Sequence, residues 1–193
     1  MVAHVGDFGI SKILAVSKSM AYMETLGTLG YIAPEYGSEG IVSSSGDVYS
    51  YGIMVMEVLT KRRPTDEEIC NENLDLRKWI TQSFSGSMMD IVDANLFREE
   101  EQITSKSEMC IASMIELALD CIKEMPKSRI SMKDVVKRLN KINNTFSGNI
   151  EVNMMLFVSV VKSSYSTTWS HILFVISLEC FEPILVYVFV IMF

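Results

Sequence analysis

Asp7 is the first side chain whose type and surroundings could support chemistry. It comes directly after a β-type run over residues 1–6, which ends at Gly6. An aspartate on a turn after a strand can present its carboxylate to a bound cation, since hard cations prefer oxygen ligands. Gly9 allows the backbone to turn sharply at this point. The tripeptide Asp7–Phe8–Gly9 is a short motif that also occurs by chance, so its meaning depends on the motifs that come later in the chain.

A long segment without regular periodicity comes next, from residue 9 to residue 36. Hydroxyl side chains and glycines interrupt any helix or strand in it, namely Ser17, Ser19, Thr25, Gly27, Thr28 and Gly30. Loops of this length are uncommon in compact domains unless they carry a function. The sequence therefore predicts an ordered loop with a functional role.

The segment from residue 43 to residue 60 is predicted to form a helix that is buried on all sides. Its apolar side chains cover every face, namely Val48, Tyr49, Tyr51, Ile53, Met54, Val55, Met56, Val58 and Leu59. A helix that is apolar all round belongs at the centre of a domain. Asp47 at its start suits the positive end of the helix dipole.

Three further stretches have the spacing of amphipathic helices, namely residues 73–84, 107–124 and 131–142. Their apolar stripes are Leu76, Trp79 and Ile80; Ile111, Ile115, Ala118 and Ile122; and Val135, Leu139 and Ile142. Ser107 is the expected N-cap of the second stretch. Ser131 and Asp134 form a start like a capping box for the third. Residues 1–147 are thus expected to be mainly α-helical.

The composition indicates a globular domain without a nucleic-acid partner. The chain has 193 residues, of which 49% are hydrophobic and 21% are charged, and its net charge is −7. A net charge of this sign argues against a nucleic-acid partner, which usually needs a basic face. The four cysteines have no metal-ligand spacing and are expected to be reduced thiols, namely Cys70, Cys110, Cys121 and Cys180. Reduced thiols favour an intracellular compartment, and no N-terminal signal peptide is visible.

Residues 148–193 differ from the rest of the chain because they hold few charges and many valine, isoleucine, phenylalanine and leucine residues. Residues 172–193 are long enough to span a bilayer. Their apolar side chains favour insertion by roughly 7 kcal/mol, which Glu179 and Glu182 near the centre offset almost completely. Two interpretations stay open: a marginal membrane anchor at residues 172–193, or a hydrophobic tail that is not native to the domain.

Five motifs in a fixed order point to a family. They are DFG (7–9), GTLGYIAPEY (27–36), GDVYSYGIMVMEVLT (46–60), RRPTD (62–66) and PKSRISM (126–132). In this order and spacing, residues 1–143 resemble the C-terminal lobe of a protein kinase, most of all that of plant leucine-rich-repeat receptor-like kinases of the serine/threonine type. The resemblance implies a mainly α fold, the C-terminal lobe of the protein kinase fold. Receptor kinases of this type place their membrane span before the kinase domain, which favours the interpretation of residues 148–193 as a non-native tail.

The resemblance implies roles for the residues at the start of the chain. Asp7 would be a magnesium ligand, since phosphoryl transfer from ATP needs magnesium to neutralise the phosphate oxygens. Phe8 would pack beneath the turn that Gly9 allows. Residues 10–32 would be an activation segment, which phosphate on one of its hydroxyls would order by pairing with a basic residue. These hydroxyls are Ser17, Ser19, Thr25 and Thr28, and plain solvation is the commoner alternative for the first three.

The resemblance also implies structural roles further along the chain. Thr28 would lie where the peptide substrate is received, with its hydroxyl facing the catalytic aspartate and favouring serine or threonine as the acceptor. Glu35 is expected to pair with Arg129, and removing one partner of such a buried pair costs about 3–5 kcal/mol. Asp47 would hold the backbone of the catalytic loop. Ile130 stands where the family usually has proline, which removes a stiff helix start but no chemistry.

Other parts of a kinase are absent from the 193 residues. The chain has no glycine-rich loop, no strand lysine of the V-A-I-K type and no H-R-D catalytic loop. It is therefore expected to be a truncated kinase domain that lacks the N-terminal lobe and has no activity of its own. ATP and magnesium, the cofactors of the parent family, are expected not to bind. The missing catalytic loop is also expected to leave apolar surface exposed on the helix at residues 46–60.

Two classes of function stay open. The first is part of an enzyme, a receptor-like serine/threonine kinase that phosphorylates proteins in signalling, in the cytoplasm or at the cytoplasmic side of the plasma membrane. The second is a non-catalytic interaction or decoy module that binds kinases or co-receptors, with or without an anchor at residues 172–193.

Overall fold

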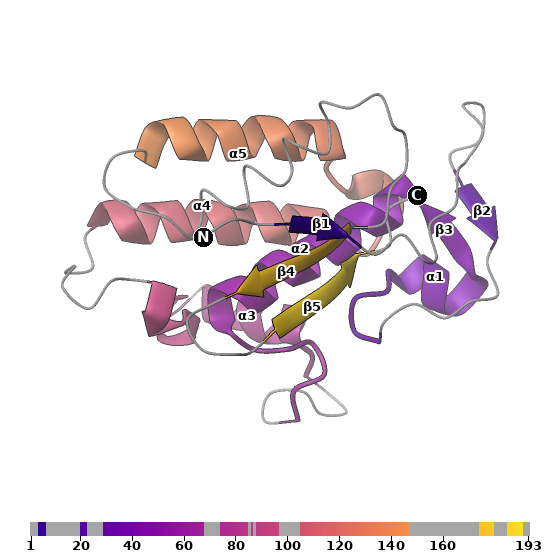
Figure 1. Cartoon of the computed structure of the whole chain (residues 1–193), viewed down its shortest axis with the longest axis horizontal. Coiled ribbons are helices and arrows are strands. Elements are labelled where there is room, and N and C mark those ends of the chain that lie inside the picture. The colour runs from indigo at the N-terminus through magenta and orange to yellow at the C-terminus, as the bar shows by residue number, and fades with distance from the viewer. Residues whose placement is uncertain are drawn as a thin grey trace.

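The computed structural model describes residues 4–6, 20–22, 29–67, 74–84, 86, 88–96, 105–146, 174–179 and 185–190. Its helices are α1 (Pro34–Glu39), α2 (Ser44–Thr60), α3 (Leu76–Phe84), α4 (Ser105–Cys121), α5 (Met132–Phe146) and the 3₁₀ helices η1 (Met88–Ile91), η2 (Ala94–Leu96) and η3 (Pro126–Ser128). Its strands are β1 (His4–Gly6), β2 (Met20–Tyr22), β3 (Ile41–Ser43), β4 (Phe174–Glu179) and β5 (Leu185–Val190). Figure 1 shows α4 and α5 side by side, with α2 behind β4 and β5.

Helix α2 forms the centre of the core. The Ser43 hydroxyl caps its first turn by accepting a hydrogen bond from the backbone N–H of Gly46 at 3.2 Å. All of its apolar residues are buried except Val58, which is partly buried, so the prediction of a helix buried on all sides is confirmed. The expected exposure of apolar surface on α2 is not seen among the described residues, because α3, α4 and β5 pack against the helix.

The close approach of α2 and α4 depends on Gly52. A Cβ atom at this position would lie 2.6 Å from Cγ2 of Ile122, 2.7 Å from Cβ of Cys121 and 3.0 Å from the carbonyl oxygen of Ala118. These distances are shorter than any ordinary carbon contact, and a close-packed interior has little room to shift. The residue without a side chain therefore sets how near the two helices lie.

Helices α4 and α5 place their apolar stripes in the same core. The predicted stripe residues Ile111, Ile115, Ala118, Ile122, Val135, Leu139 and Ile142 are all buried. The Ser131 hydroxyl caps α5 as predicted, because it accepts a hydrogen bond from the backbone N–H of Asp134 at 3.2 Å. The prediction for Ser107 is wrong: α4 begins at Ser105, so Ser107 already lies inside the first turn, where it is buried.

The two cysteines within the described ranges are buried free thiols, Cys110 and Cys121, as the sequence predicts. Burial raises the pKa of Cys110 to about 11 and that of Cys121 to about 12. A thiol with so high a pKa is a poor nucleophile, so both side chains act as core residues. Cys70 and Cys180 lie outside the described residues.

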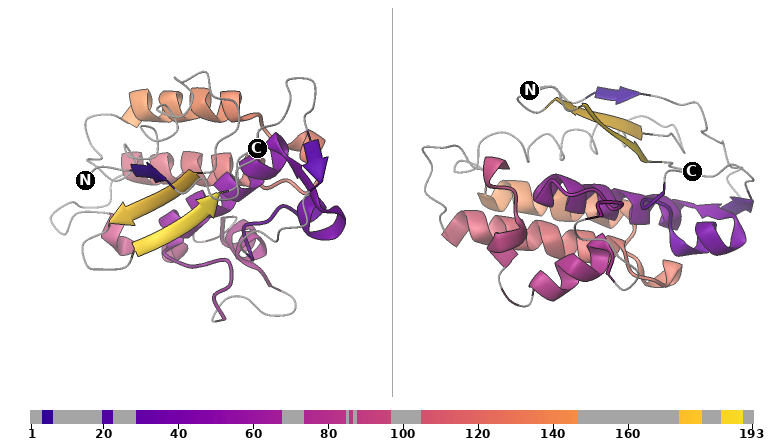
Figure 2. Two further views of the ribbon diagram at one scale, coloured as in Figure 1. Left: turned by 45° about the vertical axis from the view of Figure 1, so that its right-hand side comes forward. Right: turned by 90° about the horizontal axis from the view of Figure 1, so that it is seen from below.

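The strands form two antiparallel sheets, one in the order β1-β4-β5 and one that pairs β2 with β3. In the first sheet His4 lies opposite Ser177 and Gly6 opposite Val175. Figure 2 shows this sheet as a layer on one side of the helices, next to α2. A separate hydrophobic tail is not supported, because β4 satisfies backbone hydrogen bonds of β1 and β5 contacts α2.

Residues 172–193 do not form one continuous helix, because they contain β4 and β5. None of the helices in the described part of the chain has the length and hydropathy needed to cross a bilayer.

Candidate functional site

The segment of residues 29–36, which comprises the end of the predicted loop and the first residues of α1, is hydrogen-bonded to α2. Ser50 on α2 donates its hydroxyl to the carbonyl oxygen of Tyr31 at 2.7 Å. The Tyr31 hydroxyl donates to the carboxylate of Glu57, which lies two helical turns further along α2. All three side chains are buried. Two hydrogen bonds from one buried helix therefore fix both the backbone and the side chain of Tyr31.

The Tyr31–Glu57 contact lies in an environment that disfavours charge. Burial raises the pKa of the Tyr31 hydroxyl, and the neighbouring Glu57 carboxylate adds to the rise. Burial also raises the pKa of the Glu57 carboxyl, although the Tyr31 hydrogen bond and the positive charge of Arg63 act in the opposite direction. The tyrosine thus keeps its proton and is the donor, and the carboxylate depends on that donor for its stability inside the core.

Gly30 brings the 29–36 segment against the turn that comes after α2. Its φ is +90°, a backbone conformation that residues with a side chain rarely adopt. A Cβ atom at Gly30 would lie 2.8 Å from both Cβ and Cγ of Pro64 and 3.3 Å from Cγ2 of Thr65. The turn begins at Lys61, whose φ is +55°, and Arg62 and Asp66 form an ion pair across it at 3.4 Å.

The far end of the 29–36 segment is held by Arg129, which connects several elements. Its guanidinium donates to the two carboxylate oxygens of Glu35, at 2.6 and 2.8 Å. It also donates to the backbone carbonyl oxygens of Ser45 at 3.0 Å, Lys123 at 2.7 Å and Glu124 at 3.0 Å. The side chain is fully buried, and a planar fork of this kind suits a two-point carboxylate contact.

Tyr49 adds an aromatic partner to this arginine. The guanidinium carbon of Arg129 lies 5.1 Å from the centre of the Tyr49 ring, within the range of a cation–π contact. A buried charge is tolerated when it is both paired and hydrogen-bonded, and Arg129 meets both conditions. The contact between Glu35 and Arg129 that the resemblance implies is thus present, with α2 and the α4–η3 connection as further partners.

Of the other candidate residues, the structure describes only Asp47. Asp47 is buried in the first turn of α2. The remaining candidates lie outside the described residues, namely Asp7, Phe8, Gly9, Ser17, Ser19, Thr25 and Thr28. Within the part of the chain that the structure describes, no group of three histidine, cysteine or acidic residues is placed to hold a metal ion.

Ser50, Glu57 and Pro64 were not among the candidate residues of the sequence, although each contacts the 29–36 segment. One signal was available for Glu57, which is the only charged residue between Tyr49 and Leu59 in an otherwise apolar helix. A buried carboxylate needs a partner, so its position alone implied one. Which residue is the partner could not be predicted, because Tyr31 lies 26 positions before Glu57 in the sequence.

Comparisons with known proteins identify the family of the chain. Residues 2–139 match the family described as protein kinase domain. The chain is 38% identical over 161 residues to the receptor kinase-like protein Xa21 of Oryza sativa subsp. japonica. It is 34% identical over 152 residues to a probable LRR receptor-like serine/threonine-protein kinase of Arabidopsis thaliana. These matches cover 77% and 76% of this chain, which spans about 15% of the length of each relative.

A solved structure is also similar. It is the pseudokinase domain of BIR2, described as an immune regulator of the RLK/Pelle family. The TM-score is 0.51 at 30% sequence identity, and the match covers 64% of this chain and 36% of that one.

Proposed function

Because the chain belongs to the protein kinase domain family, we propose that it forms the substrate-binding part of a receptor-like serine/threonine protein kinase. In this proposal the 29–36 segment is the surface on which a peptide substrate lies, and Thr28 directs specificity to serine and threonine. The relatives are receptor kinases, so we place the domain at the cytoplasmic side of the plasma membrane.

The observation that carries the proposal is the rigid attachment of the 29–36 segment to α2. Tyr31 is held by Ser50 and Glu57, Gly30 is packed against Pro64, and Glu35 is held by Arg129. A segment that is ordered before the ligand arrives loses less conformational entropy on binding.

Asp7 is assigned as the magnesium ligand of the complete kinase, in which ATP supplies the phosphoryl group and magnesium neutralises its charge. The 193 residues contain none of the glycine-rich, lysine and H-R-D motifs of that reaction. We therefore infer that this polypeptide transfers no phosphate when it is isolated. Purified chain should show no ATP binding by calorimetry and no phosphate transfer to a serine peptide with magnesium. Micromolar ATP affinity with transfer would overturn this inference.

The binding part of the proposal is tested separately, with fluorescein-labelled peptides of ten to fifteen residues that contain one central serine. Fluorescence anisotropy should show saturable binding to the purified chain. Glu57→Gln keeps an acceptor for the Tyr31 hydroxyl and should bind as the wild type does, whereas Tyr31→Ala should weaken binding. If no serine peptide binds, the 29–36 segment is not a substrate surface.

A second candidate function is a non-catalytic module that binds other kinases. It is favoured by the similarity to a pseudokinase domain that is described as an immune regulator. The two functions differ in their ligand. A module of this kind should bind a complete receptor-like kinase domain with equal affinity whether or not Tyr31 is replaced by alanine, and should not bind serine peptides.

A further inference from the structure

The turn after α2, residues 61–66, borders the 29–36 segment. The contact is direct, because Pro64 fills the space where a side chain at Gly30 would lie. Arg63 precedes Pro64 and is exposed. Its positive charge acts to lower the pKa of both Tyr31 and Glu57, against the larger effect of burial.

Two other charged groups of the segment and of the neighbouring turn already have partners. Glu35 is paired with Arg129, and Arg62 is paired with Asp66. Glu57 is buried and accepts the hydrogen bond from Tyr31. Within the described residues, no ion pair within salt-bridge distance involves Arg63. It is therefore an exposed positive charge, next to the segment, that is available to a ligand.

Leu29 gives the same surface an apolar element. Its side chain is 76% exposed, although it directly precedes the tightly held Gly30. Leu29 thus adds an exposed apolar side chain to the segment that borders the turn of Arg63, on a protein whose net charge is −7.

We propose that Arg63 is a specificity-determining residue that selects protein substrates with an aspartate or glutamate close to the phosphorylated serine or threonine. The proposal rests on the proposed function, because it assigns the substrate class of the 29–36 segment. An extended peptide rises about 3.3 Å per residue, so an arginine side chain reaches about two positions along it. In this proposal the acceptor serine or threonine lies on Gly30, so the acidic side chain should stand within about two residues of it.

The same charge disfavours basic substrates. A lysine or arginine in that position would meet Arg63, and the nearby carboxylate of Glu57 is buried and already holds the Tyr31 hydroxyl. Ion pairs between exposed groups are weak, so the expected preference for an acidic over a neutral neighbour is about two- to fivefold in Kd. Salt should reduce the preference, since the Debye length is about 3 Å at 1 M ionic strength.

The test uses the full 193-residue chain and four labelled serine peptides, read out by fluorescence anisotropy. One peptide has glutamates within two residues of the serine, one has glutamines there and one has lysines there. The fourth carries the same number of glutamates near its end, which keeps the net charge but moves it away from the serine. The variants are Arg63→Gln and Arg63→Glu.

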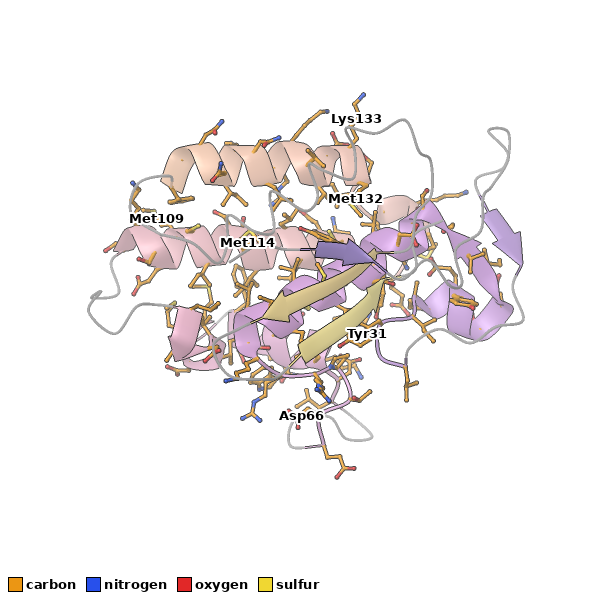
Figure 3. All side chains as sticks on the ribbon, in the orientation of Figure 1. Tyr31, Asp66, Met109, Met114, Met132 and Lys133 are labelled. Carbon is orange, nitrogen blue, oxygen red and sulfur yellow. The ribbon has the colours of Figure 1, made fainter. Side chains whose placement is uncertain are left out.

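Lys133→Gln is the matched control, because it removes one exposed positive charge on α5. Figure 3 shows Lys133 and Tyr31 in well-separated parts of the molecule. The wild type and Lys133→Gln should prefer the first peptide over the second and fourth. Arg63→Gln should lose the preference, and Arg63→Glu should favour the lysine peptide. All variants should keep the circular dichroism spectrum of the wild type, because Arg63 and Lys133 are exposed.

The possible results separate the two proposals. If serine peptides bind but Arg63→Gln keeps the full preference, Arg63 does not set specificity and the substrate surface itself stands. If Lys133→Gln loses as much preference as Arg63→Gln, the effect is one of overall charge and the role of Arg63 is overturned. If no serine peptide binds at all, the proposed function fails and this inference fails with it.

Discussion

The guanidinium of Arg129 forms two hydrogen bonds with the carboxylate of Glu35, although 94 positions separate the two residues. The pair joins α1 to the residue directly after η3, and the same arginine donates to the backbone of Ser45 in α2 and of Lys123 after α4. One buried side chain thus links the end of the 29–36 segment to two helices of the core.

Replacement of Arg129 by alanine should strongly destabilise the fold. Glu35 would keep its charge in a partly buried position and several carbonyl oxygens would lose their donor, so we expect a loss of about 3–5 kcal/mol in the free energy of unfolding. Arg129→Lys should recover only part of this, because lysine cannot form the two-point contact. Urea denaturation followed by circular dichroism measures both. Lys137→Ala, which removes an exposed ion pair with Asp134, is the control and should change little. An equal loss in this control would contradict the prediction.

The Glu57 carboxyl should make the stability of the fold depend on pH. Burial raises its pKa above the ordinary value of 4.5, so the folded chain binds more protons than the unfolded chain above that pH. The free energy of unfolding must then fall as the pH rises from about 4.5 through the raised pKa. Glu57→Gln should remove this fall, and Glu39→Gln on the exposed end of α1 should keep it. Thermal or urea unfolding between about pH 4 and pH 8 measures the slope, and an unchanged slope in Glu57→Gln would rule out this assignment.

Tyr31→Phe should show how much the Tyr31 hydroxyl contributes to the free energy of unfolding. The variant keeps the ring but removes the hydrogen bond that Glu57 accepts, and an unsatisfied buried group costs about 1–3 kcal/mol. The Tyr31 hydrogen bond lowers the pKa of Glu57, so its loss should extend the fall in stability to higher pH. The double variant Tyr31→Phe, Glu57→Leu, compared with its two single variants, isolates the coupling, because leucine offers no acceptor. If the two single effects simply add, the two side chains do not interact as the structure shows.

Gly52→Ala should destabilise the contact between α2 and α4. The added methyl group would lie within 2.7 Å of both Ile122 and Cys121, and overpacking of this kind costs about 1–3 kcal/mol or more. Gly37→Ala in α1 is a matched control, because no atom lies within 4 Å of its added methyl group and alanine is the better helix former. Urea denaturation should show a loss for Gly52→Ala and none for Gly37→Ala. Similar values for both would show that the helices have room to separate.

Gly30→Ala should release the 29–36 segment from the turn after α2. The new side chain would strain a backbone with φ of +90° and would meet Pro64 at 2.8 Å. We expect faster amide hydrogen exchange at Ile32 and Ala33 and weaker binding of serine peptides. Combining it with Pro64→Ala should restore binding only in part, because the contact is relieved but the backbone strain stays. Wild-type exchange and affinity in Gly30→Ala would show that the segment is not held at this point.

Features that depend on near neighbours in the chain could be predicted well. Helix α2 was predicted from apolar residues on every face, and the cap of α5 from Ser131 and Asp134, three positions apart. The pairing of Glu35 with Arg129 came from the resemblance to a family rather than from spacing. The start of α4 was placed two residues late, because Ser107 offered a good cap while helix geometry extends back to Ser105.

Features that depend on how elements cross could not be predicted. The sequence implied a partner for Glu57, but only the position of the 29–36 segment over α2 identifies it as Tyr31. The strands β4 and β5 were missed because an apolar stretch of this length has no periodicity that separates a membrane helix from buried strands. Their pairing with β1 joins residues from opposite ends of the chain, such as His4 and Ser177, which no local pattern encodes.

The sequence by itself determined the family, the central buried helix and the residues able to cap and line the helices, because these depend on motifs and on the 3.6-residue period. The tertiary structure decided which residues lie against each other: Tyr31 with Glu57, Gly30 with Pro64, and Gly52 with Cys121. The reason is physical. Helix formation is governed by contacts within one or two turns, whereas these pairs exist only where packing of the core brings distant segments together.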